Sequence, residues 1–167
     1  MADSMKLIGP LARLADEDVT ILLQCAVPRP FRRDEVILEQ GQMNSSLYIV
    51  LSGLLHVRRH AQGRKVLLGR MGSGSFFGDV SIFDPGPTSA AVVAVEPGRL
   101  LEITGDHLRR FTEQRPSAAA ALLSGLLELM AKRLRRTDDR LVDAIFWEGM
   151  MREPAESAAP RSPAKRN

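Results

Sequence analysis

Residues 72–94 read GSGSFFGDVSIFDPGPTSAAVVA, and this stretch says more about the fold than any other part of the chain. It begins with glycine-rich turn residues, contains two adjacent phenylalanines, and ends in small and β-branched residues typical of a strand. Gly78 followed by residues 79–82 predicts one short helical turn, whose N–H groups would point outward and could bind an anion such as a phosphate. Taken alone, the stretch is also explained by a surface connection between two strands, since glycine-rich turns are common there.

Short apolar runs separated by turn residues lie on both sides of this stretch. They occupy residues 36–38, 47–51, 54–57, 66–68, 91–95 and 100–103, with Ser52-Gly53, Gln62-Gly63 and Pro97-Gly98 among the turns between them. No helical period separates most of these runs, and therefore no βαβ unit is expected. The fold class is predicted to be mainly β with flanking helices, built on an antiparallel, jelly-roll-like β-roll over about residues 28–104.

Helical periodicity flanks the predicted roll. Before it, Asp16 is expected to cap an amphipathic helix that ends near Cys25. After it, Asp106 is expected to cap a short helix through Phe111. A long helix, opened by Pro116, is predicted over about residues 117–146.

Length and composition limit the number of domains. The chain has 167 residues, 44% of them hydrophobic and 26% charged, which predicts one domain over residues 1–148 and a disordered tail over 149–167. Its one cysteine, Cys25, cannot form an internal disulfide and favours a reducing compartment, so the cytoplasm is the expected location. No membrane span is expected, because no window approaches the ~18 consecutive apolar residues that a span requires.

The predicted long helix carries a heptad seam, which indicates a partner helix. Apolar residues alternate at spacings of three and four, and the homodimer contacts are expected at Leu123, Leu127, Met130, Leu134 and Leu141. The alternative is that the stripe packs on the roll. Arginines flank the seam together with Asp138 and Asp139, a mixture more typical of a solvated face than of a DNA-reading surface. DNA is therefore expected to be an unlikely partner of this protein.

No pattern of residues indicates catalysis or a metal. His56, His60 and His107 have no carboxylates at a metal-binding spacing, and the serines of residues 73–81 have no accompanying histidine and acid pattern. The sequence therefore predicts no enzyme, no catalytic residues, no metal and no cofactor.

Four motifs, in order and at family spacing, resemble the cyclic nucleotide-binding domain of the Crp/Fnr-like superfamily. They are Glu39-Gln40-Gly41, the run from Leu47 to Gly53, the run from Gly74 to Ser81, and Ser89-Ala90. The resemblance implies a β-roll in which Phe77 to Ala91 form a phosphate-binding cassette. Since no helix-turn-helix pattern follows the long helix, we expect a stand-alone domain that lacks this module.

The resemblance also implies the ligand-binding residues. The residue at Gly78 would offer its backbone N–H, the acid at Asp79 would hold a ribose hydroxyl, and Ser89 with Ala90 would bind the cyclic phosphate. Thr137 and Asp138 lie where related bacterial regulators present polar groups to the purine. The full predicted set is Phe77, Gly78, Asp79, Val80, Ser81, Thr88, Ser89, Ala90, Thr137 and Asp138.

Two positions depart from the family pattern. The usual glutamate is Asp79, which is one methylene shorter, and the arginine that normally pairs with the cyclic phosphate is Thr88. A neutral hydroxyl cannot replace a bidentate guanidinium, and the loss of such a charged hydrogen bond costs about 1.5–3 kcal/mol of binding free energy. Arg70 or Arg99 could supply a substitute charge from a neighbouring strand.

These observations predict a non-catalytic sensor that binds a small phosphorylated ligand such as cAMP or cGMP and signals in trans to a protein partner. Three alternatives stay open: a ligand-free dimeric scaffold that recruits a protein, a sensor of a different nucleotide such as a cyclic dinucleotide, and a nucleic-acid module. The sequence does not identify the partner.

Overall fold

The computed structural model of the chain describes residues 9–152. The chain divides into two compact units, Met1–Met130 and Ala131–Asn167. The helical elements are the 3₁₀ helix η1 (Gly9–Arg13), α1 (Asp16–Cys25), α2 (Gly105–Gln114) and α3 (Pro116–Arg152). The strands are β1 (Val27–Phe31), β2 (Val36–Leu38), β3 (Met43–Asn44), β4 (Ser46–Ala61), β5 (Arg64–Met71), β6 (Phe76–Phe77), β7 (Gly86–Pro87) and β8 (Ala91–Thr104).

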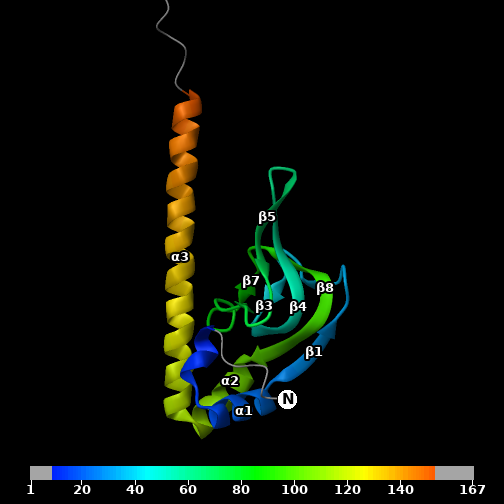
Figure 1. Ribbon diagram of the computed structural model, residues 1–167, viewed down its shortest axis with the longest axis vertical. Helices are drawn as coiled ribbons and strands as arrows, with labels where there is room; N and C mark the ends of the chain where they lie inside the picture. The colour runs from blue at the N-terminus through cyan, green and yellow to red at the C-terminus, as the bar shows by residue number, and fades with distance from the viewer. Residues whose placement is uncertain (1–8, 153–167) are drawn as a thin grey trace, which may run out of the picture. The chain divides into compact units, whose positions relative to one another are not determined.

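All strand pairs are antiparallel, which confirms the predicted fold class (Figure 1). The main sheet has the order β1-β8-β4-β5, with β2 also paired to β8 and β6 to β4. The short strands β3 and β7 form a separate two-stranded sheet. The predicted arrangement of a helix, a β-roll and further helices is therefore correct.

The strands differ from the prediction in length. β4 joins two predicted runs across Ser52-Gly53, and β8 joins two runs across Pro97-Gly98. These residues were expected to form turns between strands, but they lie where the β4–β8 register shifts, and a long strand can bend at such irregularities without ending. The short strands β3, β6 and β7 were not predicted, because two residues are too few to show a period.

Close backbone contact makes glycine necessary at one of these bends. A Cβ atom added to Gly98 would lie 2.0 Å from the carbonyl oxygen of Ser52 and 2.7 Å from the Phe31 ring. The obstructing oxygen belongs to the backbone of the paired strand and cannot rotate away. β4 and β8 can therefore cross at this separation only without a side chain at residue 98.

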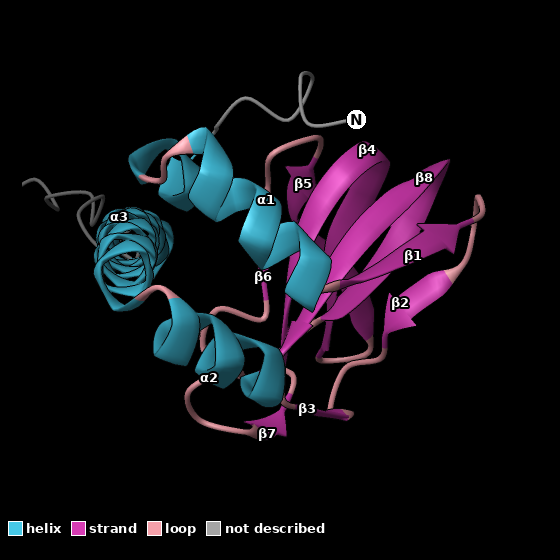
Figure 2. Cartoon of the chain, turned by 90° about the horizontal axis from the view of Figure 1, so that it is seen from below, coloured by secondary structure: helices cyan, strands magenta, loops and turns pink. Residues whose placement is uncertain are grey.

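Two hydrophobic clusters form the core of the first unit. One joins the helices to the sheet and contains Leu22, Ile103, Phe111, Leu122 and Leu126, all less than 2% exposed. The other fills the roll, where strand residues such as Leu55, Phe77 and Leu100 are buried. Figure 2 shows α1 and α2 on one side of the strands, where the first cluster lies.

The helix caps differ from the predicted ones. Asp16 is the first residue of α1 rather than its cap; the N-cap is Ala15, whose side chain cannot accept a hydrogen bond. α2 begins one residue before Asp106 and is capped by Thr104, whose hydroxyl accepts from the His107 N–H while the His107 ring accepts from the Thr104 N–H. The prediction missed this capping box because histidine occupies the position where glutamate or glutamine is usual.

The long helix extends beyond its predicted end. α3 continues through Arg152, so residues 149–152, expected to belong to a disordered tail, are helical. The rest of the predicted tail, residues 153–167, lies outside the described residues. No helix within residues 9–152 is long and apolar enough to cross a membrane.

The contact at Gly98 predicts a large cost for one added methyl group. We expect Gly98→Ala to lower the free energy of unfolding by about 2–3 kcal/mol, because the backbone of β4 must shift to relieve the clash. Gly69→Ala is the matched control, since a Cβ at Gly69 meets no atom within 4 Å. Urea unfolding measures both variants, and equal stabilities would contradict the argument.

Candidate functional site

The segment after β6 forms the predicted helical turn. The Ile82 N–H donates to the Gly78 carbonyl at 3.1 Å, and the N–H groups of Phe83 and Asp84 both donate to the Val80 carbonyl, at 3.0 and 2.9 Å. The helical turn expected from the sequence is therefore present. We call residues 78–84 the cassette turn.

The backbone at the start of the cassette turn has no room for a side chain. Gly78 has φ +76°, which L residues rarely adopt, and a Cβ there would lie 2.2 Å from the Ser46 carbonyl oxygen. The Asn44 side-chain amide donates to that same oxygen at 2.9 Å, while the Asn44 amide oxygen accepts from the Ser46 N–H at 3.2 Å. The turn is therefore held directly against the beginning of β4.

The two phenylalanines of β6 anchor the turn in both cores. Phe76 is 2% exposed and belongs to the cluster beneath the helices, whereas Phe77 is 6% exposed and belongs to the cluster inside the roll. Phe77 stacks on Tyr48 of β4 with ring centroids 4.8 Å apart and planes 13° apart. The predicted ligand residue Phe77 is thus packed within the roll.

Tyr48 also makes polar contacts near the site. Its hydroxyl donates to Glu102 Oε1 at 3.1 Å and lies 3.5 Å from Asn44 Oδ1. Burial, together with the negative charge and hydrogen bond of Glu102, raises the pKa of Tyr48 to about 12. Asn44 and Glu102 were not predicted as part of this region, because nothing in the sequence links them to the cassette.

Thr88 is bound to the loop of residues 39–42. Its N–H donates to the Gln42 carbonyl at 2.9 Å, and its carbonyl accepts from the Gly41 N–H at 2.8 Å. Its hydroxyl donates to the Glu39 carbonyl. Thr88 therefore joins two of the motifs that carry the family resemblance, which are distant in the sequence.

The remaining predicted cassette residues differ in exposure. Asp79 and Ala90 are buried, at 6% and 8% exposed, and Ser81 is half-buried. Val80, at 55%, and Ser89 are exposed. The structure thus brings the predicted residues from Phe77 to Ala90 together along one segment that is bound to the 39–48 region.

The predicted base-binding residues lie in the second unit. Thr137 and Asp138 are both exposed on α3, and the Thr137 hydroxyl donates to the Arg133 carbonyl one turn earlier at 3.0 Å. Their contribution to the site stays a prediction.

Arg70 does not supply the missing cation. It pairs with His56, whereas the neighbouring pair, Leu55 and Met71, points into the core of the roll. Because side chains alternate across a sheet, Arg70 lies on the outer face. Arg99 is exposed on β8.

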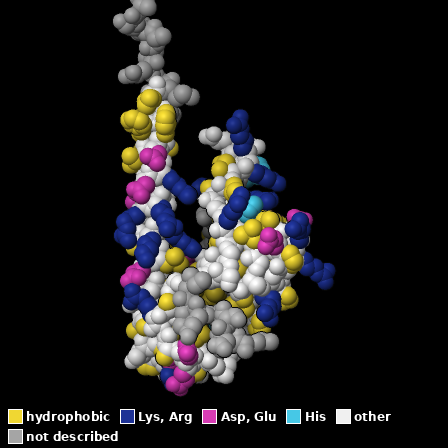
Figure 3. All heavy atoms as spheres, in the orientation of Figure 1, with side chains coloured by type: hydrophobic (Ala, Val, Ile, Leu, Met, Phe, Trp, Pro, Cys, Tyr) yellow, Lys and Arg dark blue, Asp and Glu magenta, His cyan; other side chains and the backbone are white. Residues whose placement is uncertain are grey.

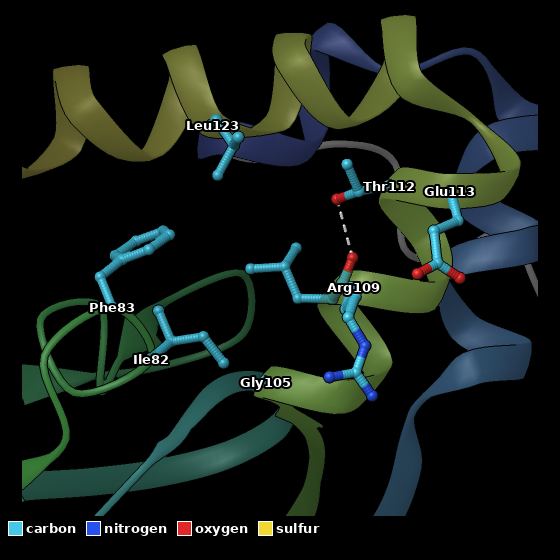
Figure 4. Close-up of a pocket in the computed structure, with 8 residues that line it drawn as sticks. Ile82, Phe83, Gly105, Arg109, Thr112, Glu113 and Leu123 are labelled. Carbon is cyan, nitrogen blue, oxygen red and sulfur yellow. Dashed lines mark hydrogen bonds between the residues drawn. The ribbon is translucent and has the colours of Figure 1, made fainter.

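An apolar pocket of about 340 Å³ lies behind the cassette turn (Figure 4). Phe83 of the turn and Leu123 of α3 face each other across it, and α2 forms the third side. The Thr112 hydroxyl, which lines this pocket, donates to the Leu108 carbonyl at 2.8 Å and is directed along its own helix. None of the predicted ligand-binding residues lines this pocket.

Comparison with known proteins identifies the family. The sequence model described as "Cyclic nucleotide-binding domain" matches residues 28–115, more than half of the chain. The chain belongs to the cyclic nucleotide-binding domain family. Its match region contains the roll, the cassette turn and α2, so the motifs that suggested the resemblance lie within the part that establishes it.

Members of the family with similar sequences include transcriptional regulators. The chain is 37% identical over 122 residues to a CRP-like cAMP-activated global transcriptional regulator of Mycobacterium tuberculosis, covering 72% of this chain and 53% of that protein. It therefore spans about half the length of that relative.

Solved structures share the fold. The crystal structure of the Thermus thermophilus catabolite activator protein matches with a TM-score of 0.72 and 32% identity, over 80% of this chain and 61% of that one. The N-terminal domain of a transcriptional regulator from Streptomyces coelicolor matches with a TM-score of 0.70 and 29% identity, over 83% and 95% of the two chains. The chain is thus a CRP-like cyclic nucleotide-binding domain in fold and sequence.

The environment of Tyr48 predicts an alkaline transition. Tyr48 is the only tyrosine, so phenolate absorbance reports this residue alone, and we expect a midpoint near pH 12 in the folded protein. The pKa of Tyr48 is near 10 in the unfolded chain. The contribution of Tyr48 to the free energy of unfolding is therefore constant below about pH 10 and falls as the pH rises towards 12.

Glu102→Gln provides the control for this titration. It removes the charge that raises the pKa of Tyr48 but leaves the burial, which is the larger cause, so the midpoint should fall while staying above 10. A folded wild-type protein that titrates near pH 10 would contradict the burial of the Tyr48 hydroxyl.

Proposed function

We propose that this domain binds a cyclic nucleotide, cAMP or cGMP, at the cassette turn and transmits binding to a protein partner without catalysing a reaction. The observation that carries the proposal is the cassette turn itself, fixed by the contact between Gly78 and Ser46 and placed within the family match. A helical turn with its N-terminal amides at a fixed position suits a phosphate. The cytoplasmic location expected from the sequence stays a prediction.

Thr88 bears on the affinity of this site. The Thr88 hydroxyl donates its hydrogen bond to the Glu39 backbone carbonyl. Thr88 therefore brings no positive charge to the cassette. An anion in the cassette would then depend on backbone N–H groups and neutral side chains. We therefore expect weak binding of a cyclic nucleotide in the wild-type protein.

The same observation favours a second candidate function. If the hydrogen bond between Thr88 and Glu39 has replaced the contact to a ligand, the cassette of this domain binds no nucleotide. The domain is then a scaffold that recruits a protein partner. The two candidates differ in one measurable property, which is whether any cyclic nucleotide binds.

The packing of Ile82 supports a transmission route for a bound ligand within the first unit. Ile82 of the cassette turn is 8% exposed and packs in the same cluster as Leu122 and Leu126, on the first turns of α3. A ligand that moves the cassette turn would therefore change the packing of α3. The ligand must bind the two arrangements with different affinity for this to act as a signal.

Homodimerisation through α3 is part of the proposal. Leu126 is fully buried, whereas its neighbour Leu127 is 66% exposed, because a helix turns about 100° per residue and the two lie on different faces. Leu134 and Leu141 continue the seven-residue spacing and are 63% and 58% exposed, while Leu123 and Met130 are half-buried. Exposed leucines at heptad spacing favour a second copy of the same helix.

Calorimetry with cAMP, cGMP and cyclic di-GMP tests ligand binding. Thr88→Arg should tighten binding of cAMP or cGMP about 10- to 100-fold, because the guanidinium adds a charged hydrogen bond to the phosphate. Asp79→Asn should weaken it, because the carboxylate acceptor for a ribose hydroxyl is lost.

Thr88→Val is the matched control for this experiment. It removes the bond to Glu39 without adding a charge, so it should not tighten binding. If neither the wild-type protein nor Thr88→Arg binds any of the three nucleotides while both remain folded, the ligand proposal fails and the scaffold remains.

The dimer is tested by native mass spectrometry, which should give twice the 18.4 kDa chain mass. Leu134→Lys combined with Leu141→Lys should give monomers, because the seam would bury unpaired charges. Val142→Lys is the control, since Val142 is 65% exposed but lies off the seam. A monomeric wild-type protein, or equal dissociation of the control, would contradict this interface.

A further inference from the structure

The hairpin of β4 and β5 carries positive charges and no negative ones, beside the exposed apolar side chains of Val66, Leu67 and Leu68. No aspartate or glutamate occurs between Gln40 and Gly78, whereas all the Lys and Arg of that interval lie on the hairpin, as Arg58, Arg59, Arg64, Lys65 and Arg70. In the described part of the chain, none of these side chains forms an ion pair with a carboxylate. The hairpin therefore presents uncompensated positive charge, and Figure 3 shows Lys and Arg gathered over its outer end.

The strand register places these charges on both faces of the hairpin. Arg58 pairs with Leu67 and His60 with Lys65, so Arg58 and Lys65 share one face. Arg59 pairs with Val66 and Ala61 with Arg64, so Arg59 and Arg64 share the opposite face. Each face of the outer hairpin thus carries two cations.

The outer hairpin extends beyond the core. Its residues 59–61 and 64–68 are all exposed, and the ribbon projects past the other strands of the roll (Figure 1). Gln40 holds the β4 edge near the tip: the Gln40 side-chain oxygen accepts from the His60 N–H at 2.7 Å, and its amide donates to the His60 carbonyl at 3.3 Å. The result is a supported two-stranded ribbon that is accessible from both sides.

The histidine at the base of the ribbon reports the local potential. His56 Nδ1 lies 3.4 Å from the Arg58 guanidinium, and desolvation followed by the charges of Arg58 and Arg70 lowers the pKa of His56. The charges of Arg58 and Arg70 thus add to desolvation in disfavouring a protonated His56.

Cations on both faces of the ribbon fit a partner that presents negative charge on two opposite sides of a groove. A flat anionic surface, such as a lipid bilayer, can contact only one face of a ribbon at a time. The major groove of B-form DNA is about 12 Å wide, admits a two-stranded β-ribbon, and has phosphates along both edges. The mixed charges that made DNA unlikely concern α3, which is a different surface.

We propose that the β4–β5 hairpin binds duplex DNA by inserting into the major groove, with Arg58 and Lys65 facing one phosphate strand and Arg59 and Arg64 the other. Gln62, at the tip, is the only amide side chain of the hairpin, and its outer part, residues 58–70, contains no Phe, Trp or Tyr. Binding therefore depends on phosphates and is independent of base sequence. The proposal does not rest on cyclic nucleotide binding.

Fluorescence anisotropy with a labelled 20-base-pair DNA duplex, in the absence of nucleotide, tests the proposal over a range of salt concentrations. The wild-type slope of log K against log salt should be about −3.6, since four phosphate contacts each contribute about −0.9. Arg58→Gln with Lys65→Gln, and Arg59→Gln with Arg64→Gln, should each reduce the magnitude of the slope by about 2.

Arg32→Gln with Arg33→Gln is the matched control, because both arginines are exposed in the turn after β1 and lie outside the hairpin. It should leave the slope unchanged. An equal effect of the control would overturn the proposal, as would the absence of duplex binding at low salt. An effect of only one face, with binding to phosphatidylserine vesicles, would instead assign the hairpin to a flat anionic surface and also overturn it.

A duplex RNA of the same length distinguishes insertion into the major groove from binding by net charge alone. Its major groove is too deep and narrow for the ribbon, so RNA should bind more weakly than DNA at equal salt. Equal affinities for the two duplexes would overturn insertion into the groove.

Discussion

The position of the cassette turn depends on the close approach of two backbones at Gly78. Ser46 begins the long central strand β4, and its carbonyl oxygen occupies the space that any side chain at residue 78 would need. This contact fixes the turn to the strand that pairs with β5, β6 and β8. Phe76 and Phe77 then divide between the two cores, so the turn is held by packing on both sides of the sheet.

The sequence predicted the fold class, the cassette turn and the approximate helices because these features have strong local signals. Glycine and proline mark turns, short apolar runs between them mark strands, and the heptad spacing marks the long helix. The bends in β4 and β8 produced the main error in the strands, since Ser52-Gly53 and Pro97-Gly98 look like turns when the partner strand is unknown. The predicted caps were also wrong: α1 is capped by Ala15, which offers no side-chain acceptor, and α2 by Thr104, which forms an unusual pair with His107.

The environment of the candidate site depends on contacts that the sequence cannot show. Thr88 is recognisable as a departure from the family pattern, but its bond to Glu39 joins residues that are far apart in the chain. The same is true of Tyr48 and Glu102, which meet across two paired strands. The charges of the hairpin are visible in the sequence, whereas their division between two faces requires the register of β4 against β5.

The loop of residues 39–42 contacts both the cassette and the basic hairpin. Glu39 accepts the Thr88 hydroxyl, and the adjacent Gln40 holds the backbone of His60. The two contacts are thus separated by the single peptide unit that joins Glu39 to Gln40. Thermodynamic reciprocity then requires that, if a molecule in the cassette changes the affinity of the hairpin for its partner, the partner changes the affinity of the cassette by the same factor.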